Sequence, residues 1–304
     1  MSKSVLSAPH FHDEEAAFAF VEARIWTNGP VCPHCKGTER IGKLSGKTTR
    51  PGLYKCYACR KPFTVRMGTI FESSHLELHL WLQAIHLLCA SKKGISSNQL
   101  ARVLGITVKS AWFLSHRIRE AMRSGDLAPM GGAGIVIEAD ETFIGRKDGM
   151  PVKRGYQHKR AVLSLVERGG SARTFHVDRA IAADVAPIVA KNIVRETTLM
   201  TDESPIYTKM GKAFASHNVV VHAANEYVRG DAHTNTVEGY FSIFKRGFKG
   251  IYQHCGEKHL HRYLAEYDFR YNNRVRLGAD DVIRAEKALR GVVGKRLTYR
   301  TTRG

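Results

Sequence analysis

Two cysteine pairs near the N-terminus constrain the fold of this chain more than any other feature. Cys32 and Cys35 form one Cys-X-X-Cys knuckle, and Cys56 and Cys59 form a second after twenty intervening residues. Each knuckle folds back so that both thiolates reach one ion, and two knuckles supply the closed tetrahedral shell of structural zinc. A redox-active pair or four buried thiols are the alternatives. The spacing predicts a zinc ribbon that holds one structural Zn2+.

The charge balance indicates a polyanionic partner. The chain has 304 residues, with 47 Lys and Arg against 28 Asp and Glu, which gives a formal net charge of +19. Such a balance favours binding to nucleic acid or to an anionic membrane and says nothing about fold. No stretch approaches the roughly 20 apolar residues of a membrane span, and the N-terminus has no apolar signal-peptide core. We therefore expect a cytoplasmic protein.

A helix-turn-helix pattern follows the ribbon. The first helix ends at Gly105 after Ser96 and Ser97, a three-residue turn follows, and a second helix runs from near Thr107 to about Met122. Alanine within the first helix and glycine in the turn are typical of this motif, although three-helix packings without a DNA role share them. The second helix would enter the major groove of DNA. The predicted DNA contacts are Lys109, Ser110 and Arg117.

The second half of the chain reads as an α/β domain after a linker at residues 127–134. Three strands are followed by a helix, a strand, a helix, a strand and a final helix, an order that predicts a mixed sheet with helices on both faces. The expected strands are 135–145, 160–166, 172–177, 198–201 and 218–222, and the expected helices are 182–194, 207–215 and one that starts near residue 233.

Two aspartates belong to strands that we expect to be neighbours. Strand alternation places Glu138 and Asp140 on one face of the first strand and Glu141 on the other. Asp202 ends the fourth strand, so its carboxylate would approach that of Asp140. Two buried carboxylates close together require a bound cation or a shared proton. Glu238, on the last helix, could supply a third ligand.

The last helix has two faces. A polar stripe carries Glu238 and, seven residues or two turns later, Lys245. A solvated helix face is the ordinary interpretation of such a pair. Beside it lies an apolar stripe suited to a core, formed by Val237, Phe241, Phe244 and Phe248.

These motifs together resemble a known family. Asp140, Asp202, Glu238 after thirty-five further residues, and Lys245 resemble the DDE motif of transposases and retroviral integrases. Longer matches resemble bacterial insertion-sequence transposases that carry an N-terminal zinc ribbon and are related to the Merlin elements. These matches are Glu138–Gly145 (EADETFIG), Thr201–Ser204 (TDES), His233–Gly247 (HTNTVEGYFSIFKRG) and Tyr267–Arg274 (YDFRYNNR).

The resemblance implies an RNase H-like fold and two active-site Mg2+ or Mn2+ ions. By this carry-over Asp140 bridges both ions, Asp202 holds one and Glu238 the other, while Lys245 grips a phosphate as a point charge. Arg246 and Lys249 are further expected DNA contacts. The implied reaction frees 3′ ends at the terminal inverted repeats of the element and joins them to target DNA. Pairing two ends implies a homodimer or a larger assembly on DNA, at the nucleoid.

Some alternatives remain open at this point. Asn235 lies one turn before Glu238 and could be the third ligand in its place. We favour Glu238, because a carboxylate neutralises Mg2+ better than an amide does. A zinc-ribbon regulator with a relic catalytic domain, or a nuclease of the same fold without strand transfer, would also fit. The expected segments are ribbon 1–70, helix-turn-helix 71–130, catalytic domain 131–280 and basic tail 281–304.

Overall fold

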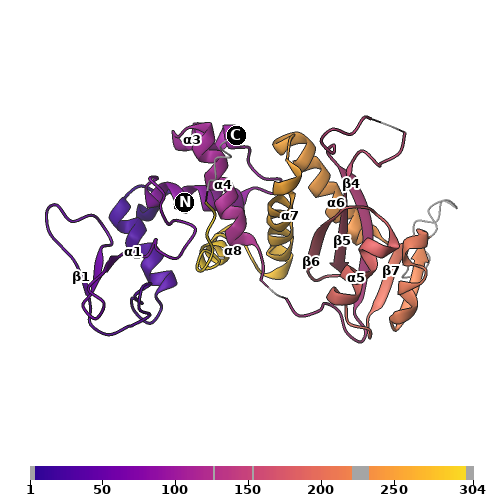
Figure 1. Ribbon diagram of the computed structural model, residues 1–304, viewed down its shortest axis with the longest axis horizontal. Coiled ribbons are helices and arrows are strands. Elements are labelled where there is room, and N and C mark those ends of the chain that lie inside the picture. The colour runs from indigo at the N-terminus through magenta and orange to yellow at the C-terminus, as the bar shows by residue number, and fades with distance from the viewer. Residues whose placement is uncertain (1–3, 126, 153, 221–232, 299–304) are drawn as a thin grey trace. The chain divides into compact units, whose positions relative to one another are not determined.

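The computed structural model of the chain describes residues 4–125, 127–152, 154–220 and 233–298 (Figure 1). The chain divides into two compact units. Unit 1 comprises Met1–Arg123 and Ala279–Gly304, and unit 2 comprises Ser124–Gly278. None of the helices in the described ranges is long and apolar enough to cross a membrane.

Unit 1 begins with a helix and a small sheet. Helix α1 (Glu14–Ile25) starts at Asp13, whose side chain accepts a hydrogen bond from the backbone N–H of Ala16 at 2.7 Å. Strands β1 (Ile41–Lys43), β2 (Tyr54–Cys56) and β3 (Pro62–Phe63) then form an antiparallel sheet in the order β1-β2-β3. Cys32 and Cys35 precede β1, Cys56 ends β2 and Cys59 lies in the turn before β3, as expected of a zinc ribbon.

The helix-turn-helix geometry predicted from the sequence is confirmed. Helix α2 (Leu78–Ala90) precedes α3 (Ser97–Leu104), which ends at Gly105 in the left-handed conformation with a φ of 66°. Helix α4 (Val108–Met122) starts at Thr107, whose hydroxyl accepts from the Ser110 N–H at 3.1 Å. The Ser96 hydroxyl likewise accepts from the Gln99 N–H at 3.1 Å at the start of α3. Side-chain caps therefore fix both helix starts.

The C-terminal segment belongs to the same unit, which the sequence did not indicate. Residues 281–304 were expected as a separate basic tail, but helix α8 (Asp281–Arg290) packs on α2 and also contacts α1 and α4. Ala288 and Leu289 are buried, and Arg24 pairs with Glu286 at 2.9 Å. Apolar residues of α8 therefore complete the core of unit 1.

Unit 2 is built on a five-stranded mixed sheet. Its strands are β4 (Val136–Ile144), β5 (Arg160–Glu167), β6 (Ala172–Val177), β7 (Thr198–Asp202) and β8 (Ser216–Val220), in the order β6-β5-β4-β7-β8. The first three are antiparallel, while β7 runs parallel to β4 and β8 parallel to β7. This confirms the mixed sheet that the sequence predicts.

Helices cover both faces of this sheet. On one face, α6 (Asn235–Gly247), a π-helical turn (Phe248–Tyr252) and α7 (Glu257–Asn272) pack on Val162 and Val166 of β5. On the other, α5 (Ala182–Asn192) packs on the alternate residues Leu163 and Leu165. The predicted apolar stripe of α6 is buried: Val237, Phe241, Phe244 and Phe248 are each at most 4% exposed.

The connection from β7 to β8 differs from the expectation. We predicted a helix at residues 207–215, but two 3-10 turns occupy this stretch, at Pro205–Tyr207 and Met210–Ala213. Gly211 explains the tight path, because a Cβ atom there would lie only 2.0 Å from His217 Nδ1. Strand β8 starts at Ser216 rather than at residue 218, and residues 221–222 of the predicted strand lie outside the described residues.

Candidate active site

The sheet brings the two aspartates of the predicted site to adjacent strands. In the parallel pairing of β4 with β7, Glu138 lies opposite Met200. Asp140 and Asp202 each follow two residues later on their own strands, so they reach the same edge of the sheet. Asp140 Oδ1 accepts from the Glu141 N–H at 2.7 Å, and Asp202 Oδ1 accepts from the Ser204 N–H at 3.0 Å.

The start of helix α6 is attached to β4 by Glu138. The carboxylate of this fully buried residue accepts from the backbone N–H groups of Thr236 and Val237, at 2.8 and 2.9 Å, and from the Thr236 hydroxyl at 2.8 Å. The first N–H groups of a helix lack partners within it and favour a negative charge. Glu138 therefore acts as a cap that comes from a different element.

Arg168 completes this attachment. Its Nε donates to Glu138 Oε1 at 2.6 Å, and its Nη2 donates to the carbonyl oxygen of His233 at 2.8 Å. The guanidinium thus compensates the buried carboxylate and holds the backbone that leads into α6. Strand alternation predicts Glu138 on the face of Asp140 but indicates no role for it. The sequence signal that could have indicated one is a carboxylate between the apolar residues Ile137 and Ala139.

Glu238 lies in the first turn of α6, and its charge acts on Asp140. Burial first, and then the negative charges of Asp202, Glu141 and Glu238, raise the pKa of Asp140 to about 8. The charges of Asp202 and Glu238 therefore both act on Asp140. Glu238 is exposed, and its Oε1 accepts from the Thr234 hydroxyl at 2.9 Å. Asn235 is also exposed, one turn earlier.

Glu141 is closer to this site than strand alternation suggested. Its side chain turns to the opposite face, where Tyr207 donates a hydrogen bond to its carboxylate. Even so, burial and the charge of Asp202 raise the pKa of Glu141 to about 7, although the Tyr207 hydroxyl lowers it. Strand alternation places Glu141 on the other face of β4, but its charge still acts on Asp140.

The carboxylates fit divalent cations by their chemistry. Hard cations prefer oxygen ligands, and a cation would relieve the mutual repulsion that raises the pKa of Asp140. Asp140, Asp202 and Glu238 are the residues that could hold them. Among the described residues, only the four cysteines place three or more ligand atoms within 4.8 Å of one another, so the carboxylates are less tightly gathered than the thiols.

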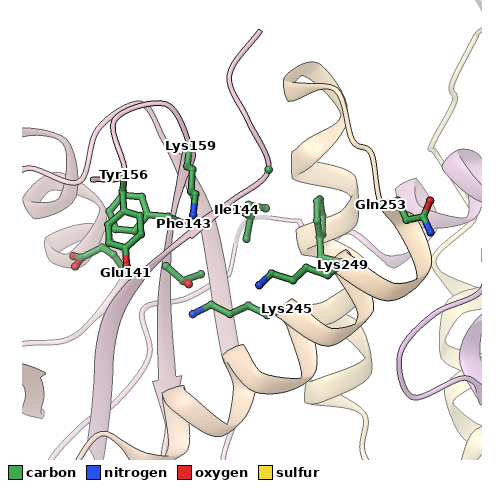
Figure 2. Close-up of a pocket in the computed structure, with 11 residues that line it drawn as sticks. Glu141, Phe143, Ile144, Tyr156, Lys159, Lys245, Lys249 and Gln253 are labelled. Atoms are coloured by element: carbon green, nitrogen blue, oxygen red, sulfur yellow. The ribbon is translucent and has the colours of Figure 1, made fainter. Parts of the chain in front are cut away.

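Basic side chains of α6 and of the π-helical turn after it lie near Glu141. Lys245 and Lys249 line a hollow of about 570 Å³ at the end of β4, which Glu141 also lines (Figure 2). Lys245 Nζ also lies 5.6 Å from the centre of the Phe241 ring. Arg246 is exposed, and its Nε donates to the carbonyl oxygen of Ser242 at 3.0 Å. Two of the three predicted cations of this segment, Lys245 and Lys249, therefore lie at one hollow.

The four predicted zinc ligands form one cluster in unit 1. The sulfur atoms of Cys32 and Cys59 are 3.6 Å apart, as are those of Cys35 and Cys56. A tetrahedral zinc with Zn–S bonds of about 2.3 Å has sulfur atoms about 3.8 Å apart, so the cluster fits this ion. Hydrogen bonds led by that from the Cys59 N–H lower the pKa of Cys56 to about 7, which favours the thiolate.

The predicted DNA contacts of α4 have different surroundings. Lys109 is exposed, whereas Ser110 is half-buried and its hydroxyl accepts from that of Thr107 at 2.9 Å. Arg117 is only 3% exposed and donates to the backbone carbonyl of Glu72. Burial lowers its pKa to about 10. The prediction that Arg117 contacts DNA is therefore wrong, because this guanidinium is packed inside unit 1 beside Trp81 and Phe113.

Comparison with known proteins agrees with this arrangement. Residues 131–272 match the ISXO2-like transposase domain, and residues 12–62 match the transposase zinc-ribbon domain. The chain therefore carries two regions that match domains of insertion-sequence transposases. Both matched regions correspond to the motifs described above, since the first spans the sheet with its carboxylates and the second spans the cysteine cluster.

Individual relatives of this chain are distant. A protein of Halobacterium salinarum, described as an uncharacterized protein in transposable element ISH50, is 29% identical over 240 residues, which span 73% of this chain and 78% of the relative. A chain in the crystal structure of a pre-cleavage Mos1 transpososome is 14% identical and matches with a TM-score of 0.25, over 68% of this chain and 73% of its own length. That score is too low to bear on the fold.

Proposed function

We propose that this chain is a transposase that cuts DNA at the ends of its insertion sequence and joins the freed 3′ ends to target DNA. The observation that carries the proposal is the parallel pairing of β4 with β7, which brings Asp140 and Asp202 to the same edge of the sheet. Burial there, and then the charges of Asp202, Glu141 and Glu238, raise the pKa of Asp140. Repulsion between these carboxylates destabilises the folded state unless it serves a function. Carboxylates with shifted pKa values are typical of functional sites.

The residues of the site would share the work as follows. Asp140, Asp202 and Glu238 would hold two Mg2+ or Mn2+ ions, with Asn235 as the alternative third ligand. When bound, these ions would supply activation of the attacking hydroxyl and stabilisation of the leaving oxygen. Lys245 would hold a phosphate of the DNA strand beside the carboxylates. Glu138 would keep Glu238 in reach by fixing the start of α6.

Unit 1 would recognise the DNA ends. The cysteine knuckles hold its zinc ribbon, and side-chain caps fix the helices of its helix-turn-helix. Lys109, at the start of α4, is the predicted contact of this unit that is exposed. Its charge would bind the phosphate backbone or a base edge. Two ends must be held together for joining, so we propose that at least two copies assemble on DNA, at the nucleoid in the cytoplasm.

The experiment is an assay with purified protein, Mg2+, a DNA end from the flanking inverted repeat and a plasmid target. Joined products would support the proposal. Nicking without joining would indicate a nuclease of the same fold. Unchanged DNA that still binds the protein would indicate a regulator with a relic catalytic domain, and either result would overturn the proposal.

A further inference from the structure

The hollow at the end of β4 is lined from three directions (Figure 2). The end of β4 forms one side, the loop before β5 contributes Tyr156 and Lys159, and α6 with its π-helical turn contributes Lys245 and Lys249. Glu141, which follows Asp140 directly in the sequence, lies at its border. The hollow therefore borders the candidate active site at Glu141, and the residues that line it all belong to unit 2.

Three ammonium groups point into this hollow. Figure 2 shows Lys245 and Lys249 extending from α6 and its π-helical turn toward the strand, and Lys159 extending from the loop before β5. Among the described residues of the lining, the only acidic one is Glu141, whose carboxylate accepts a hydrogen bond from the Tyr207 hydroxyl. The hollow is thus suited to more than one negative charge, spaced along an extended ligand.

An aromatic platform stands beside these charges. The rings of Tyr156 and Phe143 are stacked, with centroids 4.7 Å apart and planes inclined by 10°. Phe143 packs on the core beneath α5, so it supports Tyr156 from behind. Tyr156 itself is 57% exposed, and Lys159 Nζ lies 5.0 Å from its ring centre. A single exposed aromatic ring is common on protein surfaces. This ring, however, packs against Phe143 and lies beside the Lys159 ammonium group.

We propose that this hollow binds an unpaired nucleotide of a DNA strand, with its base stacked on Tyr156 and its neighbouring phosphates held by Lys159 and Lys249. The inference rests on the proposed function and names a subsite for its substrate. A nucleotide strand combines repeated negative charge with flat aromatic faces, which is the pairing that the lining presents. Duplex DNA offers only base edges to a protein, so the base must leave the stack to reach Tyr156.

The test measures binding without catalysis. The full chain is titrated, in EDTA, against a fluorescent oligothymidylate and against an abasic strand of the same length, which carries the same phosphates without bases. Fluorescence anisotropy gives both affinities. Base stacking on an aromatic side chain is worth about tenfold in affinity. We therefore expect the wild type to bind the oligothymidylate more tightly than the abasic strand. In Tyr156→Ala the ratio of these two affinities, the preference for bases, should fall about tenfold. Tyr156→Phe should retain it.

A charge series separates the phosphate contacts. Lys159→Gln should weaken both strands alike and reduce the salt dependence of binding by about one charge. Lys191→Gln, on the exposed surface of α5, is the matched control and should change neither. Equal binding of both strands by wild type and Tyr156→Ala, or loss of the preference in Tyr156→Phe, would overturn the subsite.

The subsite and the proposed function fail in different ways. If wild type does not cut DNA in Mg2+ but Tyr156→Ala still loses the preference for bases, the function is wrong and the subsite stands. If wild type cuts and joins DNA while Tyr156→Ala binds and cuts as wild type does, the subsite alone is wrong. A thermal melt of each variant confirms folding, and little loss is expected because Tyr156 is largely exposed.

Discussion

The carboxylate of Glu138 on strand β4 accepts a hydrogen bond from the backbone N–H of Val237 at the start of helix α6, at 2.9 Å. Ninety-nine residues separate the two in sequence. Since Asp140 is two residues along the same strand and Glu238 is next to Val237, this bond fixes the distance between two predicted metal ligands. We infer that Glu138 is a positioning residue for the site.

Replacement of Glu138 tests this inference. Glu138→Gln removes the charge that Arg168 and the N–H groups of α6 require, and we expect a loss of roughly 2–4 kcal/mol in the free energy of unfolding. Cutting should also need more Mg2+, because Glu238 is no longer held in place. Measuring the cutting rate against Mg2+ concentration checks this. A merely structural role would leave the Mg2+ dependence unchanged in the folded fraction, and exposed Glu196→Gln serves as the control.

Asp202→Asn should abolish cutting and leave DNA-end binding intact. The substitution removes a ligand charge with almost no change in shape. Loss of a group that merely supports a metal ligand already costs ten- to a hundredfold, so we expect a fall of more than about a hundredfold. Gel-shift and cleavage assays on the same preparation measure both properties. Loss of end binding would contradict the assignment of Asp202 to the metal site.

The third ligand can be identified by a pair of variants. Glu238→Gln should abolish cutting, because its carboxylate contributes charge beside Asp140, whereas Asn235→Ala should leave most of the activity. Both side chains are exposed, so neither change should lower stability greatly. Cleavage rates at saturating Mg2+ decide between them. Full activity of Glu238→Gln with an inactive Asn235→Ala would reverse our choice.

The raised pKa of Asp140 predicts how the metal-free protein responds to pH. Its ordinary value of 3.8 applies to the unfolded chain, while burial and the neighbouring charges raise it to about 8 in the folded chain. The folded state therefore binds more protons between these values, and stability should fall as pH rises from about 4 to about 8. Thermal melts in EDTA measure this slope.

Asp140→Asn provides the matched comparison for that slope, because an amide does not titrate. The variant should be less sensitive to pH over the same window. Mg2+ should restore stability to wild type most at high pH, where protons no longer compete for the carboxylates. An identical pH dependence in both proteins would show that Asp140 is not the titrating group.

Removal of zinc should unfold the ribbon. Cys32 and Cys56 are buried in the small core that also holds Phe63, so Cys56→Ser or a strong chelator would open that core. We expect loss of one bound zinc per chain, measured by elemental analysis, and weaker binding to DNA ends. Cys255→Ser is the control, since its thiol lies outside the cluster and donates to the Gly256 carbonyl. Full zinc content in Cys56→Ser would contradict the assignment.

Local patterns in the sequence were sufficient for much of this structure. Cysteine spacing predicted the thiol cluster, and the alternation of β4 placed Glu138 with Asp140. The helical period of α6 predicted which phenylalanines are buried. Each of these follows from regular geometry over a few residues, which a single sequence displays directly.

Features that depend on distant contacts could not be predicted. Arg117 was read as a DNA contact from its position on α4, but that helix is buried nearly all round and the guanidinium finds the Glu72 carbonyl instead. The role of Glu138 depends on its hydrogen bonds to α6. The contact between α2 and α8 joins segments from opposite ends of the chain. In each case the partner lies far away in sequence.

The packing of α8 on α2 has a consequence for synthesis on the ribosome. Unit 1 is assembled from two segments, and the second is translated only after the whole of unit 2. The core of unit 1 is therefore incomplete, with the surface of α2 uncovered, until Ala288 and Leu289 have left the ribosome. A chain that is truncated before this point would lack the apolar side chains of α8 that complete the core of unit 1.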